Sequence, residues 1–283
     1  MHHKTLNIVG AGRVGCTLAR LWHTHGPFQV QAVCNTTPAS AHDATQFIGS
    51  GQAFHALHAL PAADLWMIAV PDAHISATAE QIAALKHPPA VAFHCSGAQS
   101  AASLSTLQHA GWSTASTHCL LSFATREAAL AQFAGTPCAL EGDAAVVQLL
   151  RHAFGAIGAQ CFEVASADKV LYHAAAVFAT NFMPVLQSLA EDAWRATGMP
   201  AHLIEPLRER LLSNAVSNIT RLGPGGALTG PAARGDHAAI ARQATVVSDW
   251  DAQAGAAYVA LSDLALRMAK ANKEAAATAA TTR

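Results

Sequence analysis

The chain has 283 residues, of which 52% are hydrophobic and 12% are charged, and its formal net charge is −1. This length exceeds what one average hydrophobic core holds, so we expect two domains. The near-neutral charge gives no support for a nucleic-acid partner, and the small charged fraction favours packed helices and a buried oligomer interface.

The first half alternates short apolar runs with helical stretches. Because the apolar runs do not alternate with polar residues, they are typical of a parallel sheet covered on both faces. The predicted strands are 6–9, 28–34, 65–70, 90–95, 113–117, 137–140 and 160–163. The predicted helices between the early strands are 14–24, 40–47 and 74–85.

After Glu163 the pattern becomes helical. Ser166 can cap a long helix that runs toward Thr197, with a kink expected at Pro184. The later predicted segments are a helix at 202–222, a glycine- and proline-rich loop at 223–231 and further helices from 237. We therefore predict an α/β domain at 1–163 followed by an all-helical domain at 164–283, which would serve substrate binding and dimerisation.

The apolar stretch 170–190 is interpreted as a buried helix, because His173 and Asn181 would be costly in lipid. The polar residues 1–4 are too short for a signal peptide.

The six scattered cysteines form no Cys-x-x-Cys pair, which indicates reduced, mostly buried thiols in a cytoplasmic protein. The histidines lack the spacing of a metal site, so no metal is expected.

A glycine-rich motif follows the first predicted strand and opens the first predicted helix. It reads Gly10-Ala11-Gly12-Arg13-Val14-Gly15. In this context Gly10 permits a tight turn, Gly12 lets the backbone approach a pyrophosphate, and Gly15 lets helix and strand pack closely. The N–H groups at the helix N-terminus would hold the pyrophosphate. The motif predicts a dinucleotide-binding Rossmann domain with a doubly wound parallel sheet.

The end of the second strand bears on the choice of dinucleotide. NAD enzymes usually place a carboxylate here for the ribose hydroxyls, but this chain has Asn35, Thr36 and Thr37, and its next carboxylate is Asp43. Without that carboxylate a 2′-phosphate meets no repulsion, and the three side chains can donate hydrogen bonds to it. We therefore expect NADP rather than NAD, although no Arg or Lys follows to pair with the phosphate.

Several stretches resemble one bacterial family. They are 10–15, Ala69-Val70-Pro71-Asp72, His94-Cys95-Ser96-Gly97-Ala98, 167–175 and 227–236. The family comprises Rossmann-like proteins assigned as NADP oxidoreductases, with a helical C-terminal domain of unknown function. It looks like a branch of the 6-phosphogluconate dehydrogenase-like superfamily, beside pyrroline-carboxylate reductase, ketopantoate reductase and prephenate dehydrogenase. The resemblance implies NADP-linked hydride transfer, a cleft between the domains and a homodimer built through the helical domain. It names no substrate.

Candidate site residues lie just past the predicted strands, at the edge where open parallel sheets bind ligands. Val70, Pro71 and Ser96 would line the path from adenosine to nicotinamide, although both segments could be simple strand-ending turns. His118 also falls at this edge. Relatives often have a His-Pro pair here with the His near the substrate, whereas this chain has Cys119. His118 is thus a candidate for proton transfer or a structural residue.

Lys169 and His173 are four residues apart at the start of the long helix, so they share one face. In hydroxyacid-dehydrogenase and ketopantoate-reductase relatives, a Lys at the matching position donates a proton to the substrate carbonyl, and an Asn four residues on orients the substrate. Here His173 takes the Asn position, and Asn181 lies two turns further on. Lys169 is our predicted proton donor, with His118 second, although a Lys near a helix start is usually solvated.

Arg234 follows the glycine- and proline-rich loop. A guanidinium can clamp a carboxylate or phosphate with two hydrogen bonds, so Arg234 is the candidate for holding an anionic substrate. The loop could equally be a connection, with Asp236 as the N-cap of the next helix.

These observations together predict an NADP-dependent oxidoreductase of small carbonyl, imine or hydroxyacid substrates. Two alternatives remain open. One is a prephenate-type or imine-type dehydrogenase in which His118 matters more than Lys169. The other is a sensor that binds NADP without turnover, which the unusual Cys119 and His173 keep open.

Overall fold

The computed structural model describes residues 4–281, and the side chains of residues 4–278. By compactness it divides into two units, Met1–Asn181 and Phe182–Arg283. The change from strands to helices falls near residue 163, as the sequence indicates, but the helical segment 164–181 groups with the first unit. A domain boundary at 163/164 stays a prediction.

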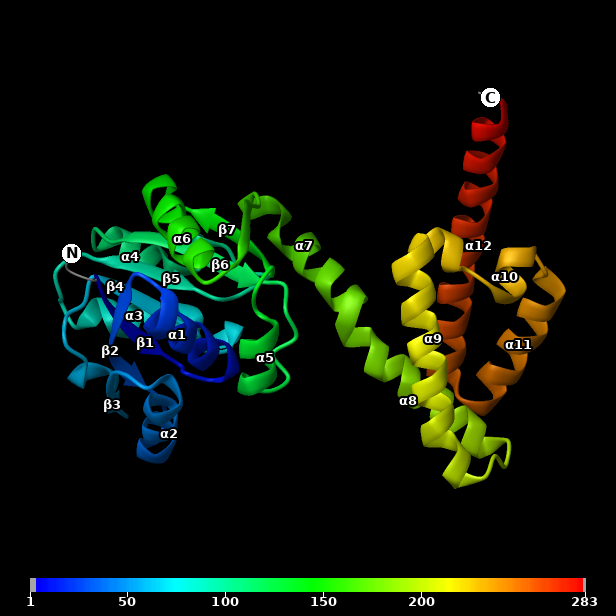
Figure 1. Ribbon diagram of the computed structural model, residues 1–283, viewed down its shortest axis with the longest axis horizontal. Coiled ribbons are helices and arrows are strands. Elements are labelled where there is room, and N and C mark those ends of the chain that lie inside the picture. Colours follow the sequence, from blue (N-terminus) through cyan, green and yellow to red (C-terminus); the bar gives the residue numbers. More distant parts are fainter. Residues whose placement is uncertain (1–3, 282–283) are drawn as a thin grey trace. The chain divides into compact units, whose positions relative to one another are not determined.

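The first unit is built on a sheet of eight strands among the described residues (Figure 1). Their order is β3-β2-β1-β4-β5-β6-β7-β8. The strands are β1 (Lys4–Val9), β2 (Phe28–Cys34), β3 (Gln52–Phe54), β4 (Leu65–Ile68), β5 (Val91–His94), β6 (Ser113–Cys119), β7 (Pro137–Gly142) and β8 (Gln160–Glu163). Neighbouring strands are parallel except for the antiparallel pair β6 and β7. The seven predicted strands are confirmed, and β3 is an additional short one.

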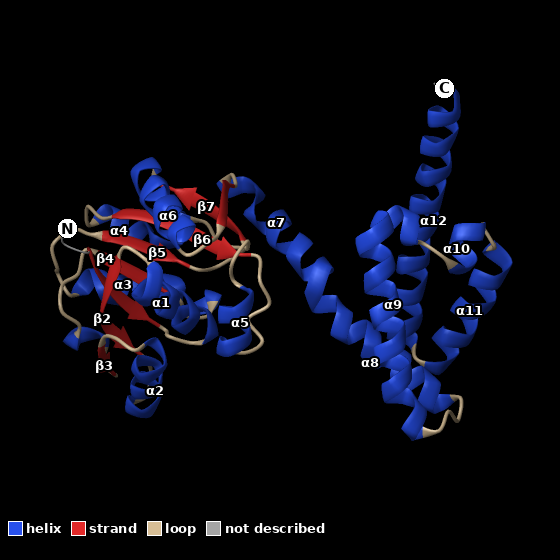
Figure 2. Cartoon of the chain, viewed as in Figure 1, coloured by secondary structure: helices blue, strands red, loops and turns tan. Residues whose placement is uncertain are grey.

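Helices cover both faces of this sheet (Figure 2). The helices of the first unit are α1 (Arg13–His25), α2 (Pro38–Ile48), α3 (Ile75–Ala84), α4 (Ser105–His109), α5 (Arg126–Gln132), α6 (Ala144–Ala156) and α7 (Lys169–Ala176), of which α7 leads away from the sheet. Side chains alternate across the sheet, so Leu65 and Met67 of β4 join one buried cluster while Trp66 and Ile68 join the other. The sheet is therefore buried on both sides, which confirms the predicted Rossmann-type fold class.

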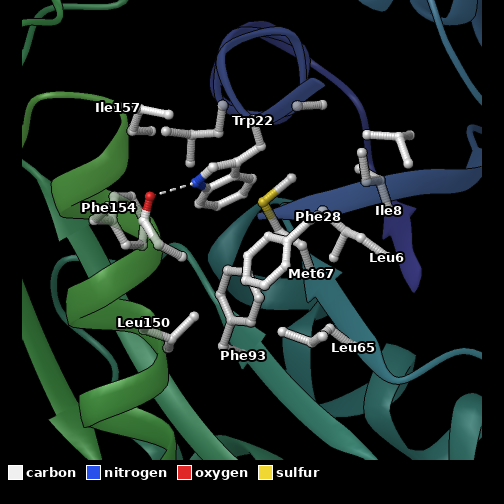
Figure 3. Packing of buried hydrophobic residues seen from close by; sticks show 14 of the residues in the cluster. Leu6, Ile8, Trp22, Phe28, Leu65, Met67, Phe93, Leu150, Phe154 and Ile157 are labelled. Atoms are coloured by element: carbon white, nitrogen blue, oxygen red, sulfur yellow. Dashed lines mark hydrogen bonds between the residues drawn. The ribbon is translucent and has the colours of Figure 1, made fainter. Parts of the chain in front are cut away.

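The larger cluster centres on Trp22 of α1, which is fully buried (Figure 3). Its ring packs edge-to-face against Phe28, Phe93 and Phe154. Its indole Nε1 donates a 3.0 Å hydrogen bond to the Ala153 carbonyl of α6, so the one polar atom of the ring is satisfied. This packing fixes α1, and with it the glycine-rich loop, against the sheet.

The second unit is helical. It consists of α8 (Phe182–Ala196), α9 (Ala201–Ala227), α10 (Gly230–Arg234), α11 (His237–Trp250) and α12 (Ala252–Thr281). The predicted long helix is divided by a wider π turn, η5 (Val177–Asn181), directly before the turn that carries Pro184. A π turn and a proline are both known causes of a kink in a helix. None of the described helices has the length and apolar character needed to cross a membrane.

The predicted loop at 223–231 is wrong in part. Helix α9 breaks at Gly223, whose φ of 70° and ψ of 168° lie outside the helical region, but helical structure resumes up to Ala227. Helix α10 then begins at Gly230. Glycine and proline here interrupt and start helices rather than forming one connection.

Candidate active site

The glycine-rich loop leaves β1 at the carboxyl edge of the sheet. Gly10 has a φ of +84°, and a methyl group there would lie 2.7 Å from Val70 Cγ1. A methyl group on Gly15 would lie 2.9 Å from the Gly10 carbonyl oxygen, whereas one on Gly12 would meet open space. Backbone packing therefore requires glycine at 10 and 15, and Gly12 leaves the loop open to a ligand.

The N-terminus of α1 fits a phosphate group. Its N-cap is Gly12, which has no capping side chain, and no acidic residue lies in the first turn. The first backbone N–H groups of a helix have no partner within the helix, and the helix dipole adds a partial positive charge there. The loop and this helix end therefore match the requirements of a dinucleotide pyrophosphate.

A cavity of about 890 Å³ lies beside this loop. Its lining includes Gly10, Ala11, Gly12, Asn35, Thr36, Ser40, Val70, Pro71 and Arg126. This volume is in the range of roughly 300–1,000 Å³ for small-molecule and cofactor sites. The cavity thus has the size and the phosphate-binding end that a dinucleotide needs.

Asn35 supports the loop with both ends of its amide group. Its Oδ1 accepts a 2.7 Å hydrogen bond from Ala11 N, and its Nδ2 donates to the Ser40 carbonyl at 3.0 Å. Thr37 is likewise engaged, because its hydroxyl accepts from Ser40 N as the N-cap of α2. Thr36, the third polar residue after β2, lines the cavity and is exposed. Among the described contacts its side chain makes no hydrogen bond of this kind.

Arg126 brings a positive charge to the same cavity. It comes from α5, far from the glycine-rich loop in sequence, and its Nη1 lies 2.7 Å from Asp43 Oδ2 of α2. The guanidinium also lies over the Phe47 ring, 5.3 Å from its centroid. Two contacts on α2 therefore hold this side chain at the cavity.

A second, smaller cavity of about 190 Å³ lies along the same sheet edge. Its lining includes Val14, Asp72, Cys95, Ser96, Gly97, Thr117, His118, Cys119 and His173. Consecutive residues line the two cavities, because Pro71 lines the large one and Asp72 lines the small one. The small cavity thus lies next to the large one.

Two imidazoles face each other across Gly97. Their ring centroids are 5.3 Å apart and their planes meet at 79°. A methyl group on Gly97 would contact His173 Nδ1 and would lie 2.9 Å from His118 Nε2. The Nδ1 atom of His173 is buried and has no hydrogen-bond partner among the described residues. Buried polar atoms are nearly always paired, so His173 Nδ1 is an unsatisfied polar atom in a residue that lines the small cavity.

His118 is held by Tyr172, whose hydroxyl lies 2.9 Å from His118 Nδ1 and 3.5 Å from its carbonyl oxygen. Burial lowers the pKa of His118 to about 4, and the nearby His173 and Lys169 add to this effect. Burial raises the pKa of Tyr172, so its hydroxyl stays protonated. At neutral pH His118 is therefore an uncharged imidazole with Nε2 left for the cavity.

Ser96 shapes the turn that carries Gly97. Its hydroxyl donates a 2.7 Å hydrogen bond to Asp72 Oδ2 and accepts bonds from Ala98 N and Gln99 N. The segment between β5 and the next helical turn is thereby tied to the segment after β4. This tie fixes the wall of the small cavity.

Lys169 lies beneath that turn. Its side chain is 1% exposed, and its Nζ donates to the Ser96 carbonyl at 3.1 Å and to Ser116 Oγ at 2.7 Å. Ser116 donates in turn to Glu141 Oε2 at 2.7 Å. The ammonium group is thus part of a buried network and is not among the groups that line the small cavity. The alternative interpretation of Lys169, a solvated lysine near a helix start, is therefore wrong.

Glu141 completes this network from β7. Its Oε1 accepts from Ser166 Oγ at 2.6 Å, and its Oε2 also accepts from Ala101 N at 2.8 Å. Burial opposes its ionisation, but the hydrogen bonds from Ser166 and Ser116 outweigh this and lower its pKa. Burial lowers the pKa of Lys169, which the Glu141 charge opposes. The network is therefore a nearly saturated charge pair bridged by a serine.

Comparison with known domain families agrees with this architecture. A Rossmann-like domain model matches residues 2–119, and the model of a domain of unknown function, DUF2520, matches residues 136–265. The two matches together span most of the chain, from the first strand of the sheet into the helical unit. The family resemblance predicted from sequence is confirmed. The DUF2520 match begins just before β7, so it includes the last two strands of the sheet.

Solved structures share the fold of this chain. A Thermotoga maritima protein is 24% identical with a TM-score of 0.75, and the match covers 95% of this chain and 99% of that one. A Bacteroides fragilis protein provisionally named an NADP oxidoreductase is 20% identical with a TM-score of 0.74, covering 93% and 98%. An imine reductase from Myxococcus stipitatus in complex with NADP⁺ is 17% identical with a TM-score of 0.61, covering 96% and 94%. Curated protein sequences give no match.

The structure gathers most of the predicted site residues at two adjacent cavities. Val14, Ser96, His118 and His173 line the small one, while the predicted residues on the large one are Gly10, Ala11, Gly12, Asn35, Thr36, Val70 and Pro71. Arg13 is exposed at the start of α1, and Gly15 lies under the loop. His118 lies within β6 rather than after it, because β6 is longer than predicted.

Two further predicted residues, Asn181 and Arg234, line neither cavity. Asn181 is exposed at the end of η5, and its Oδ1 accepts from Thr180 Oγ1. Arg234 is exposed at the end of α10 in the second unit. Asp236 caps α11 by accepting from Ala239 N, as the alternative interpretation of this loop expects.

Sequence reasoning missed Asp72 and Arg126. The sequence around Asp72 indicates only a strand-ending turn, and the Ser96 contact is what places its carboxylate at the small cavity. Arg126 is 83 residues from its partner Asp43, and no local pattern links the two.

Proposed function

We propose that this protein is an NADP-dependent oxidoreductase that transfers hydride between nicotinamide and a small carbonyl, imine or hydroxyacid substrate. The observation that carries the proposal is the adjacency of the two cavities at one sheet edge. The phosphate-binding loop lines the large cavity. Two imidazoles line the small one, and one of them has an unpartnered nitrogen. Relatives of the same fold named as an NADP oxidoreductase and an imine reductase support the assignment.

The proposal gives each part of the chain a task. Gly12 and the free N–H groups of α1 bind the pyrophosphate, and Val70 and Pro71 line the path toward the small cavity. When bound there, the nicotinamide supplies hydride transfer. The small cavity is below the size of a complete ligand site, so it accepts the reacting end of a substrate.

We assign proton transfer to His118. When Tyr172 donates to Nδ1, Nε2 carries the hydrogen. It can pass this proton to a carbonyl oxygen or an imine nitrogen while Nδ1 takes the hydroxyl proton of Tyr172, which solvent then replaces, so that the ring stays neutral. When Nδ1 donates to Tyr172, Nε2 is free to accept the proton of a hydroxyl group. The two tautomers suit reduction and oxidation respectively, and the low pKa of His118 keeps the ring neutral in both. His173 Nδ1 then orients the substrate.

We assign a positioning role to Lys169, the residue that sequence resemblance favours as proton donor. Two of its three ammonium hydrogens are bonded to the Ser96 carbonyl and the Ser116 hydroxyl. From there it holds the turn that carries Gly97 against both imidazoles. Its charge also helps to keep His118 neutral.

Binding and turnover assays on the full chain test this proposal. We expect NADPH to bind, and NADPH absorbance to fall when a matching carbonyl or imine is added. A prephenate-type dehydrogenase would instead reduce NADP⁺ with a hydroxyacid-like substrate. The presence of His118 in the lining of the small cavity favours keeping that alternative. NADPH binding with no turnover across both substrate classes would favour a sensor. Failure to bind NADPH or NADH would contradict the proposal.

We further propose that the substrate is anionic, that Arg234 holds its anion, and that the protein is a homodimer formed through the second unit. Arg234 is exposed, and the helices of that unit carry exposed apolar side chains, including Leu203, Val216, Leu222 and Val259. Light scattering checks the dimer, and a clean monomer would contradict it. For Arg234→Ala we expect a higher KM for an anionic substrate with little change in kcat.

A further inference from the structure

We infer that Arg126 is the specificity residue for the 2′-phosphate of the dinucleotide, and that Asp43 holds it in place until the phosphate displaces the carboxylate. The inference rests on the proposed function, because it takes the large cavity as the dinucleotide site. Arg126 supplies the positive charge that the residues directly after β2 lack. The arginine reaches the cavity from α5, across the fold, rather than from the strand end where such a residue is usually sought.

The position of Arg126 fits the ribose end of the cavity. Thr36 and Ser40, which follow β2, line the cavity together with Arg126. In Rossmann domains this strand end faces the adenosine ribose, while the pyrophosphate lies on the first helix. The only Arg or Lys that lines the cavity, among the described residues, is Arg126. A phosphate at the ribose 2′ position would therefore find its positive partner here.

The Asp43 contact is suited to exchange. The Arg126 and Asp43 side chains are 25% and 63% exposed, and exposed ion pairs of this kind contribute little to stability. Only Nη1 of the guanidinium takes part in the ion pair, so its other N–H groups are free of that contact. A phosphate can accept two parallel hydrogen bonds from a guanidinium and carries more charge than one carboxylate. Stacking on Phe47 keeps the guanidinium in place during the exchange.

The ion pair with Arg126 explains how the Asp43 carboxylate on α2 is compatible with a preference for NADP over NAD. In an NAD enzyme the carboxylate at this region binds the ribose hydroxyls and repels a 2′-phosphate. Here the carboxylate is one turn into α2 and is paired with Arg126, so its charge is compensated. The pair therefore lowers the electrostatic barrier to the phosphate while keeping the arginine ordered.

Equilibrium titrations of the full chain with NADPH and NADH test the inference. For Arg126→Ala we expect NADPH affinity to fall roughly 10- to 100-fold, with NADH affinity within about threefold of wild type. Arg126→Lys should give an intermediate loss, because it keeps the charge but not the two-pronged geometry. Adenosine 2′-phosphate should follow the NADPH pattern and adenosine 5′-phosphate the NADH pattern, which gives a readout that needs no turnover.

A matched control is available in the Arg151–Glu163 pair. Its atoms are 2.6 Å apart and its side chains are 34% and 61% exposed, close to the values of the Arg126 pair, but it lies off the cavity. Arg151→Ala should leave both affinities unchanged. Asp43→Asn should raise NADPH affinity a few fold and leave NADH affinity unchanged, because it removes the competitor for Arg126.

Two results would overturn the inference. If Arg126→Ala lowers NADPH and NADH affinity equally, the arginine contacts the pyrophosphate or supports the fold instead. If neither affinity changes, Arg126 does not bind the cofactor at all. Binding of neither dinucleotide by the wild type would overturn the proposed function as well, so the two failures are distinguishable. Circular dichroism of each variant shows whether its fold is intact.

Discussion

Two polar clusters lie at the same edge of the sheet and differ in how completely their hydrogen bonds are satisfied. The cluster of Lys169, Ser116 and Glu141 is buried and nearly saturated. The pair of His118 and His173 faces a cavity, and one of its buried nitrogens has no partner among the described residues. The contrast indicates that the first cluster serves the structure and the second serves a ligand.

The same contrast changes the role of the lysine. Resemblance to hydroxyacid dehydrogenases suggests an ammonium group aimed at a substrate, whereas the structure aims it at the Ser96 carbonyl and Ser116. A buried charge with two strong partners resists being drawn away from them. The His118 imidazole, which we propose Lys169 positions indirectly, makes no described hydrogen bond through Nε2. The predictions below test this division of roles.

The largest effect is expected for His118→Asn. Loss of a positioned general acid and base should lower kcat roughly 100- to 10,000-fold, while NADPH affinity stays near that of wild type. Steady-state kinetics and a binding titration check both parts. The matched control is His87→Asn, since His87 is also half-buried and hydrogen-bonded, to the Leu60 carbonyl, but lies off the small cavity. Equal turnover of the two variants would remove His118 from the reaction.

Lys169→Met should destabilise the fold. The substitution leaves the buried Ser116 and Glu141 groups without their cation, and we expect a loss of about 3 kcal/mol in the free energy of unfolding. Urea denaturation measures this, and the double variant Lys169→Met with Glu141→Gln should recover part of the loss. A variant with unchanged stability and abolished turnover would instead support Lys169 as the direct proton donor.

Stability should fall as the pH is lowered from about 6.5 to about 4. His118 has a pKa of about 4 in the folded protein against 6.5 for the free side chain, so the unfolded chain binds more protons in this window. The effect should approach about 3 kcal/mol at the acid end. Burial lowers the pKa of His94 too, which adds in the same direction. In His118→Asn the slope between these pH values should be shallower, and an identical slope would contradict the burial of a neutral ring.

Gly97→Ala should give the smallest of these effects. The added methyl group would contact His173 Nδ1 and crowd His118 Nε2, so one ring must move. We expect kcat/KM to fall roughly 10- to 100-fold with NADPH affinity retained. Gly155→Ala is a suitable control, because a methyl group there meets open space. If Gly97→Ala behaves like this control, the two imidazoles do not act together on the substrate.

Local patterns in the sequence predict the parts of the site that are local in the chain. The loop from Gly10 to Gly15 is set by steric demands between adjacent elements, and its spacing predicts both its conformation and its helix. Strands such as 28–34 follow from short apolar runs and match the structure. The antiparallel pairing of β7 with β6 has no such signal, because direction depends on how the chain crosses the sheet.

The rest of the site depends on contacts between distant segments. Lys169 looks like a solvated helix residue until Ser116, 53 residues away, is placed beside it. Asn35 looks like a cofactor ligand until the Ala11 backbone takes its amide oxygen. Arg126 gives no sequence signal, since only the fold brings it to the residues after β2. Residue type predicts what a side chain can do, but the tertiary structure decides which partner it meets.

A crystal structure of the full chain with NADP⁺ tests the central claim most directly. We predict the pyrophosphate at the N-terminus of α1 and the nicotinamide ring at the small cavity, with its C4 toward the space between Gly97, His118 and His173. A nicotinamide ring bound away from the two imidazoles would contradict the account.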